Sequence, residues 1–158
     1  MHNMEIERKF LIKKMPDLSH LKPIKSERYF LYIWNWIELR IQSKDDKYEL
    51  ERKEKISVLS REWIKVNISK EEFDILKEKA FKSLIRDNYY LWNNVSIKIY
   101  HWEFEWLIRY EVEFDSEKDA NNFIKPDFIW KEITDSPLWK DSKLINLSKE
   151  EFIKLINK

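Results

Sequence analysis

The stretch Met4-Glu5-Ile6-Glu7-Arg8-Lys9-Phe10-Leu11-Ile12 is the most informative part of the chain. In a β-strand its side chains alternate, so Glu5, Glu7 and Lys9 share one face while most of the apolar residues share the other. Two carboxylates about 6 to 7 Å apart on one strand can ligate a divalent cation, and a lysine beyond them can bind the phosphate that such a cation carries. The same alternation fits a plain strand whose charged face meets water. Both interpretations stay open on this stretch alone.

The size and charge of the whole chain limit the classes of protein to which it can belong. Its 158 residues predict one domain, 1–158, that is long enough to bury a core. Lysine and arginine total 30 against 29 acidic residues, so no overall field attracts nucleic acid or a membrane. Cysteine is absent, which excludes disulfides and thiolate chemistry. The N-terminus is too charged for a signal peptide, and no apolar run approaches the ~20 residues of a membrane span. We therefore expect a cytoplasmic protein without nucleic-acid or membrane partners, and the sequence leaves its oligomeric state open.

Charged faces recur on later segments that alternate with the period of a strand. Strands are predicted at 28–33, 36–42, 48–53, 61–68, 83–90, 95–100 and 108–114. The polar residues that share a face are Glu38, Arg40 and Gln42 in the second of these, Glu49, Glu51 and Lys53 in the third, and Arg109, Glu111 and Glu113 in the last.

Two capping boxes mark the starts of helices. Ser69-Lys70-Glu71-Glu72 precedes apolar residues at helical spacing and predicts a helix over 70–81, and Ser148-Lys149-Glu150-Glu151 predicts a terminal helix. Ser116 begins a third, short helix that extends to Phe123.

Together the eight strands and three helices predict an α+β protein built on an eight-stranded antiparallel β-barrel with its helices packed outside. Closure into a barrel would hide the sheet edges. Strand alternation alone does not say whether the charged faces point outward or inward. If the charged faces point inward, the continuously apolar faces lie outside the barrel, where helices can pack on them.

The composition has an unusual feature, since the chain has no glycine and eight tryptophans. Average usage predicts roughly 11 glycines in a chain of this length. Several tryptophans stand in turns between strands, where a positive φ is needed and a bulky side chain is unfavourable. We expect that many or all of them occupy glycine sites, because the source reads UGA as glycine. The alternative is an aromatic-rich core or a base-stacking surface. The tryptophans are Trp34, Trp36, Trp63, Trp92, Trp102, Trp106, Trp130 and Trp139.

The order and spacing of the charged motifs resemble the CYTH superfamily, the triphosphate tunnel metalloenzymes. The resemblance covers nearly the whole chain and depends mainly on Glu5-x-Glu7-x-Lys9 and Arg109-x-Glu111-Val112-Glu113-Phe114. Weaker support comes from Ile37-Glu38-Leu39-Arg40, from 48–53 and from Lys131-Glu132-Ile133-Thr134. The resemblance implies an antiparallel tunnel in which acidic residues hold Mg²⁺ or Mn²⁺ and basic residues hold a triphosphate.

The resemblance also implies roles for individual residues. The catalytic set would be Glu5, Glu7, Lys9, Glu111 and Glu113, of which the four glutamates would hold the metal or orient the attacking water. A triphosphate carries about four negative charges, so several cations are needed to bind it. Lys9 also fits a simpler role as an ion-pair partner of Glu7 or Glu111. The substrate-binding set would be Lys9, Arg40, Lys53, Arg86, Lys98 and Arg109.

The chain departs from the family pattern at several positions. Trp63 and Lys65 stand where many members carry two acidic residues on the fifth strand, and Lys98 stands at an acidic position of the seventh. Tyr89 and Leu138 stand at basic positions. The loss of acidic residues disfavours a second metal site.

Three functions follow from this resemblance. The leading hypothesis is metal-dependent hydrolysis of inorganic triphosphate or of an organic triphosphate. The alternative is a polyphosphate- or nucleotide-binding module without catalysis, which the extra lysines favour. Class IV adenylate cyclase activity is a third and disfavoured hypothesis.

Overall fold

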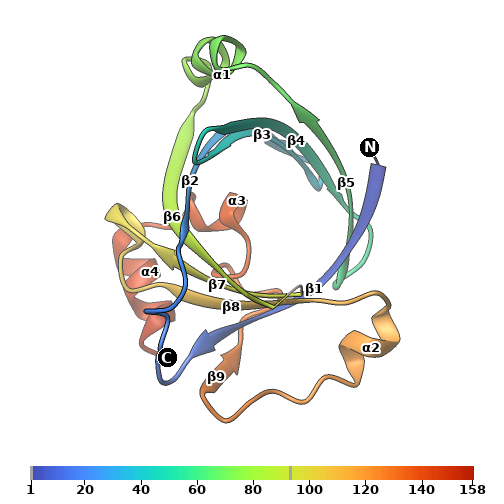
Figure 1. The fold of residues 1–158 in the computed structure, drawn as a ribbon, viewed down its shortest axis with the longest axis vertical. Helices are drawn as coiled ribbons and strands as arrows, with labels where there is room; N and C mark the ends of the chain where they lie inside the picture. The colour runs from blue at the N-terminus through green and yellow to red at the C-terminus, as the bar shows by residue number, and fades with distance from the viewer. Residues whose placement is uncertain (1, 93) are drawn as a thin grey trace.

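The computed structural model describes residues 2–92 and 94–158, although not the side chains of His2 and Asn3. Strand alternation generates nine strands in this part of the chain (Figure 1). They are β1 (His2–Ile12), β2 (Ile24–Trp34), β3 (Ile37–Lys44), β4 (Lys47–Lys55), β5 (Ser60–Asn67), β6 (Lys82–Trp92), β7 (Val95–Tyr100), β8 (Ile108–Glu113) and β9 (Ile129–Glu132).

The first eight strands close into an antiparallel barrel, which confirms the predicted fold class. Hydrogen bonding follows the order β5-β4-β3-β2-β6-β7-β8-β1, and β1 then pairs with β5 to complete the ring. In β1, residues 2–6 face β5 and residues 7–11 face β8. The short strand β9 was not predicted, and it pairs with the end of β1 outside the ring.

The helices are short and begin where their caps predict. Both predicted capping boxes are formed, by Ser69 at α1 (Lys70–Lys77) and by Ser148 at α4 (Lys149–Ile156). Ser116 caps α2 (Glu117–Asn121). The first helix ends four residues earlier than expected, since 78–81 form a turn that leads into β6. The sequence did not predict α3 (Asp141–Leu144) or the 3₁₀ turn Trp102–Phe104.

Figure 1 looks along the barrel and shows α1, α2 and α4 outside the ring of strands, with α3 projecting inside it. The C-terminal segment reaches into one end of the barrel. There the inward-facing Phe30 and Leu84 form one apolar cluster with Leu138, Trp139 and Leu144. This cluster closes that end of the tunnel. In the described residues, no helix is both long and apolar enough to cross a bilayer.

The charged faces of the strands point into the barrel. Glu7, Lys9, Arg40, Glu51 and Glu111 are all buried, and each lies on the predicted polar face of its strand. The apolar residues on the opposite faces contact the outer segments, as Tyr110 and Phe10 do with Phe128 and Phe123. The structure thus shows that the charged faces point inward to a lumen, a choice that strand alternation alone left open.

Three of the eight tryptophans have a left-handed backbone conformation. The φ angles are 66° at Trp36, 59° at Trp102 and 85° at Trp106. These are the turn positions at which the sequence favours glycine. Trp139 differs, because it lies in the apolar cluster with 1% of its surface exposed.

Candidate active site in the tunnel

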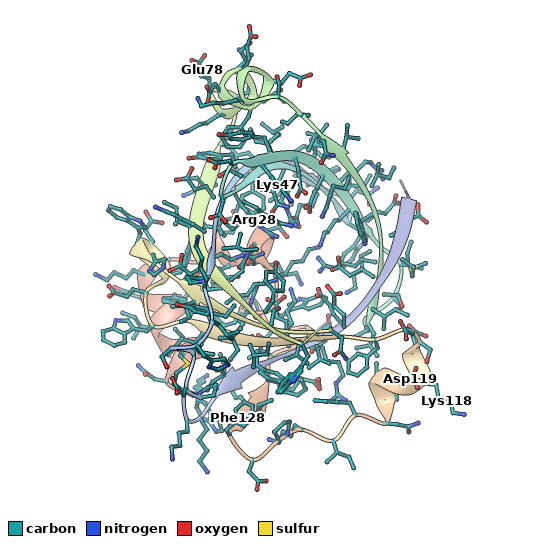
Figure 2. The ribbon with its side chains drawn as sticks, in the orientation of Figure 1. Arg28, Lys47, Glu78, Lys118, Asp119 and Phe128 are labelled. Atoms are coloured by element: carbon teal, nitrogen blue, oxygen red, sulfur yellow. The ribbon has the colours of Figure 1, made fainter. Side chains whose placement is uncertain are left out.

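The tunnel cavity is lined mainly by charged side chains from every barrel strand and from the start of α3 (Figure 2). Among the described residues, ten basic and six acidic side chains line it, which gives a net positive lining when all are ionised. The basic residues are Lys9, Arg28, Arg40, Lys44, Lys53, Arg61, Lys65, Arg86, Lys98 and Lys140, and the acidic residues are Glu5, Glu7, Glu51, Glu111, Glu113 and Asp141.

The β1 glutamates are held by cations from the neighbouring strands. Glu5 accepts hydrogen bonds from Lys53 Nζ at 2.8 Å and from Arg61 Nη2 at 2.7 Å. Glu7 is paired with Arg61 and with Lys9, whose Nζ lies 3.2 Å from Glu7 Oε1. Burial opposes ionisation of Glu5, but Lys53 and Arg61 hold its pKa well below the ordinary value. Lys9 therefore forms the ion pair that the simpler interpretation expects, while it also lines the cavity.

Arg40 organises the β3–β4 side of the tunnel. It donates to Glu51 Oε2 at 2.7 Å and also pairs with Glu38 on its own strand. Gln42 donates to Glu49 Oε2 at 2.8 Å and to Glu51. Adjacent strands place these side chains opposite one another, because Arg40 is in register with Glu51 and Gln42 with Glu49.

The β8 carboxylates have different environments. Glu111 accepts from Lys98 Nζ at 2.9 Å and from Arg109 Nε at 3.0 Å. Glu113 lies opposite Glu7 in the β1–β8 register. Burial, followed by repulsion from Glu5 and Glu7, raises the pKa of Glu113. Glu113 is thus the predicted acidic residue whose negative charge is least compensated.

The structure brings the predicted site residues together, and Arg109 alone among them does not line the cavity. Its side chain is 1% exposed and lies behind the lining, against Glu111 and Asp141. Glu5, Glu7, Lys9, Arg40, Lys53, Arg86, Lys98, Glu111 and Glu113 all line the cavity.

Two of the positions compared with the family lie elsewhere than expected. Tyr89 packs in the outer apolar cluster, because the inward positions of β6 are Arg86, Asn88 and Tyr90. Leu138 is buried in the cluster that closes the barrel end rather than lining the tunnel.

Seven charged residues of the described lining were not among the predicted site residues, namely Arg28, Lys44, Glu51, Arg61, Lys65, Lys140 and Asp141. Arg28 and Arg61 each stand at the start of a predicted strand. Those strands were predicted mainly from their apolar residues, so the sequence did not show that the two arginines point into the barrel. Lys140 and Asp141 lie outside the barrel strands, and only the path of the C-terminal segment brings them into the tunnel. Asp141 contacts three arginines, with Arg86 Nη1 at 2.9 Å from Oδ2.

Several arginines have unused hydrogen-bonding capacity at the cavity. The buried Nε atoms of Arg28, Arg40, Arg61 and Arg86 have no acceptor among the described residues. A buried donor without a partner is costly, so these nitrogens are available to an anion or to water. Both amide atoms of Asn88, which is 0% exposed, are likewise without partners in the described part of the chain.

The tunnel carboxylates fit a metal ion that takes only one or two of its ligands from the protein. In the described part of the chain, no three acidic or histidine side chains lie close enough to form a complete metal site. Mg²⁺ needs no such cage, because it commonly binds one or two carboxylates and completes its shell with water and substrate phosphate. Glu7 and Glu113, opposite each other and near Glu5, are carboxylates of this kind.

The described residues thus form a closed antiparallel barrel with a charged, net positive lumen. No family model matches the chain. It is 27% identical over 150 residues to an inorganic triphosphatase from Nitrosomonas europaea, and the match covers 89% of this chain and 95% of that protein.

Solved structures agree with this relationship. The crystal structure of an inorganic triphosphatase matches with a TM-score of 0.64 and 25% identity, over 91% of this chain and 95% of that one. A Bacillus halodurans protein, provisionally assigned as an adenylate cyclase, shares the fold at a TM-score of 0.59 and 16% identity over 76% of this chain and 85% of its own. With its full-length barrel and its Glu5-x-Glu7-x-Lys9 strand, the chain is thus similar to the CYTH-type tunnel proteins that its sequence resembles.

Proposed function

We propose that this protein hydrolyses a triphosphate inside its tunnel with the help of Mg²⁺ or Mn²⁺, and that inorganic triphosphate is the first substrate to test. The observation that carries the proposal is the net positive lining, in which four arginine Nε atoms have no acceptor among the described residues. A linear triphosphate offers about four negative charges and many acceptor oxygens, which matches this surplus of donors. The similarity to an inorganic triphosphatase over nearly the whole chain supports the same substrate class.

The basic residues would bind and orient the substrate. Arg28, Arg40 and Arg86 come from three adjacent strands, so their guanidinium groups can contact successive phosphate groups of an extended chain. Phosphoryl transfer depends mostly on positioning and on compensation of charge, so fixed cations of this kind lower the barrier.

The acidic residues would hold the metal and the water. Glu7 and Glu113 would ligate a divalent ion together with substrate oxygens, and such an ion neutralises developing charge and activates a bound water. Glu113 can orient the attacking water and accept its proton, because its raised pKa makes it the more basic of these carboxylates.

Turnover of tripolyphosphate, thiamine triphosphate and ATP with Mg²⁺ and with Mn²⁺ tests the proposal. We expect phosphate release from at least one of them, a loss of about 10²-fold or more in kcat for Glu113→Gln, and retained binding of the substrate. Glu103→Gln, an exposed charge change outside the tunnel, is the control and should keep full activity. Absence of turnover with all three substrates would contradict the proposal.

A second candidate is a polyphosphate-binding module without catalysis. Lys98 is bonded to Glu111, and Arg61 bridges Glu5 and Glu7. Basic side chains thus already pair with three of the four glutamates that the family resemblance implies as metal ligands. Calorimetry that detects tripolyphosphate binding in a protein without turnover would favour this candidate. ATP conversion to cyclic AMP would instead indicate the cyclase activity.

A further inference from the structure

A carboxylate from the C-terminal segment lies among the arginines of the tunnel. Asp141 begins α3, outside the barrel strands, and its side chain is 1% exposed. Arg28 and Arg86 donate to its Oδ2 at 3.0 and 2.9 Å. Arg109 Nη1 lies 3.1 Å from Oδ1, to which the Tyr100 hydroxyl also donates. Such a cluster of guanidinium groups around one anion is the arrangement with which proteins bind phosphate.

The same arginines face the cavity with capacity to spare. Arg28 and Arg86 line the cavity together with Asp141, and each bonds that carboxylate through its Nη1 atom. One carboxylate neutralises only part of the charge of three guanidinium groups. Each arginine can therefore hold Asp141 with one nitrogen and a substrate oxygen with another.

Asp141 is fixed in place by the apolar residues around it. Leu138 and Trp139 precede it and Leu144 follows it, and all three are buried in the cluster that closes the barrel end, with at most 1% of their surface exposed. Withdrawal of Asp141 would expose this apolar surface to water, which is unfavourable. Its negative charge is thus a permanent part of the closed end.

We propose that Asp141 is a specificity-determining residue whose fixed charge ends the phosphate-binding part of the tunnel, and so selects a triphosphate over longer linear polyphosphates. The inference rests on the proposed function, because it assumes that the arginines bind phosphate groups. A phosphate group added at the closed end of a bound triphosphate would have to lie against the Asp141 carboxylate, and like charges at contact distance in a desolvated site repel strongly.

Calorimetry without metal tests this inference by measuring Kd for tripolyphosphate and tetrapolyphosphate. Asp141→Asn keeps the size and one acceptor oxygen but removes the charge, so we expect the ratio of Kd for tetrapolyphosphate to Kd for tripolyphosphate to fall about tenfold. Asp141→Glu keeps the charge on a longer side chain and should leave the ratio unchanged or raise it. Glu49→Gln removes a carboxylate that lies behind the lining and contacts Lys44 and Lys65, so it should strengthen both affinities and leave the ratio as it is.

The outcomes separate this inference from the proposed function. An unchanged ratio in folded Asp141→Asn protein, or a lowered ratio in Asp141→Glu protein, overturns the role of Asp141. The second variant decides the question if the first fails to fold. If the variants change the ratio of the two Kd values as expected but the wild-type protein has no turnover, only the proposed hydrolysis is overturned. If the wild-type protein binds neither polyphosphate, both proposals are overturned.

Discussion

At the scale of single residues, the tryptophans in turns conflict with their backbone conformation. Trp102 and Trp106 have positive φ angles, and their side chains are 78% and 80% exposed. A left-handed conformation costs a residue with a Cβ about 1–2 kcal/mol, and exposed side chains contribute little packing to offset that cost. Glycine adopts the same conformation without this penalty.

Trp102→Gly and Trp106→Gly should each raise the free energy of unfolding by about 1 kcal/mol, because the relief of strain exceeds the added chain entropy of glycine. Urea unfolding measures the change. Trp34→Gly is the matched control, since Trp34 is also exposed but is not among the residues with positive φ. A gain of equal size in Trp34→Gly would contradict the backbone explanation.

The expectation that UGA encodes glycine in the source stays a prediction. The positive φ angles at Trp36, Trp102 and Trp106 support it at three positions, whereas the burial of Trp139 gives it no support there. Peptide masses of the native protein should show glycine at these three turns. Tryptophan masses, or UGG codons in the gene, would contradict it.

At the scale of elements, caps and alternation give the short helices and long strands their boundaries. Ser69 Oγ accepts from the backbone nitrogen of Glu72, while the Glu72 carboxylate accepts from the Ser69 nitrogen. This box begins α1 so that Phe73 packs on Tyr29 and Tyr48, with ring centroids 5.6 and 5.0 Å apart. A local sequence signal here positions a helix over the outer face of the barrel.

Ser69→Ala should therefore lower the free energy of unfolding by about 1 kcal/mol, because it leaves a helix N-terminal donor without its side-chain acceptor. Thermal or urea unfolding measures this loss. Ser83→Ala, an exposed serine in β6, should have little effect. Equal losses in the two variants would show that the cap contributes nothing specific.

At the scale of the whole molecule, charge is separated between the tunnel and the surface. The chain carries a formal net charge of +1, yet its tunnel lining has ten basic and six acidic side chains among the described residues. Burial lowers the pKa of Lys98 to about 7. It lowers the pKa of Lys9, Lys44 and Lys140 to about 8. The tunnel without an anion thus loses part of its positive charge as the pH rises from 7 to 8.

Binding of tripolyphosphate at pH 8 should be accompanied by proton uptake by these lysines, since a bound anion favours their charged form. The affinity should fall as the pH rises through 7–8. Calorimetry in buffers of different ionisation enthalpy measures the protons taken up. Lys98→Met should reduce the uptake, and comparison with wild-type protein cancels the titration of the ligand itself. Equal uptake in the two proteins would contradict a role for Lys98.

The strands, the helix starts and the residues that share each charged face are all readable from the amino-acid sequence, because they follow from side-chain alternation and local capping. The resemblance to the CYTH superfamily then implies that Glu5, Glu7 and Lys9 share a site with Glu111 and Glu113. Alternation has the same period whether a face meets water or a lumen, so it is the closure between β1 and β5 that directs the charges inward. The entry of Asp141 into the tunnel depends on the path of a segment 113 residues away from Arg28 along the chain. Only tertiary packing at the barrel end could bring those two charges together.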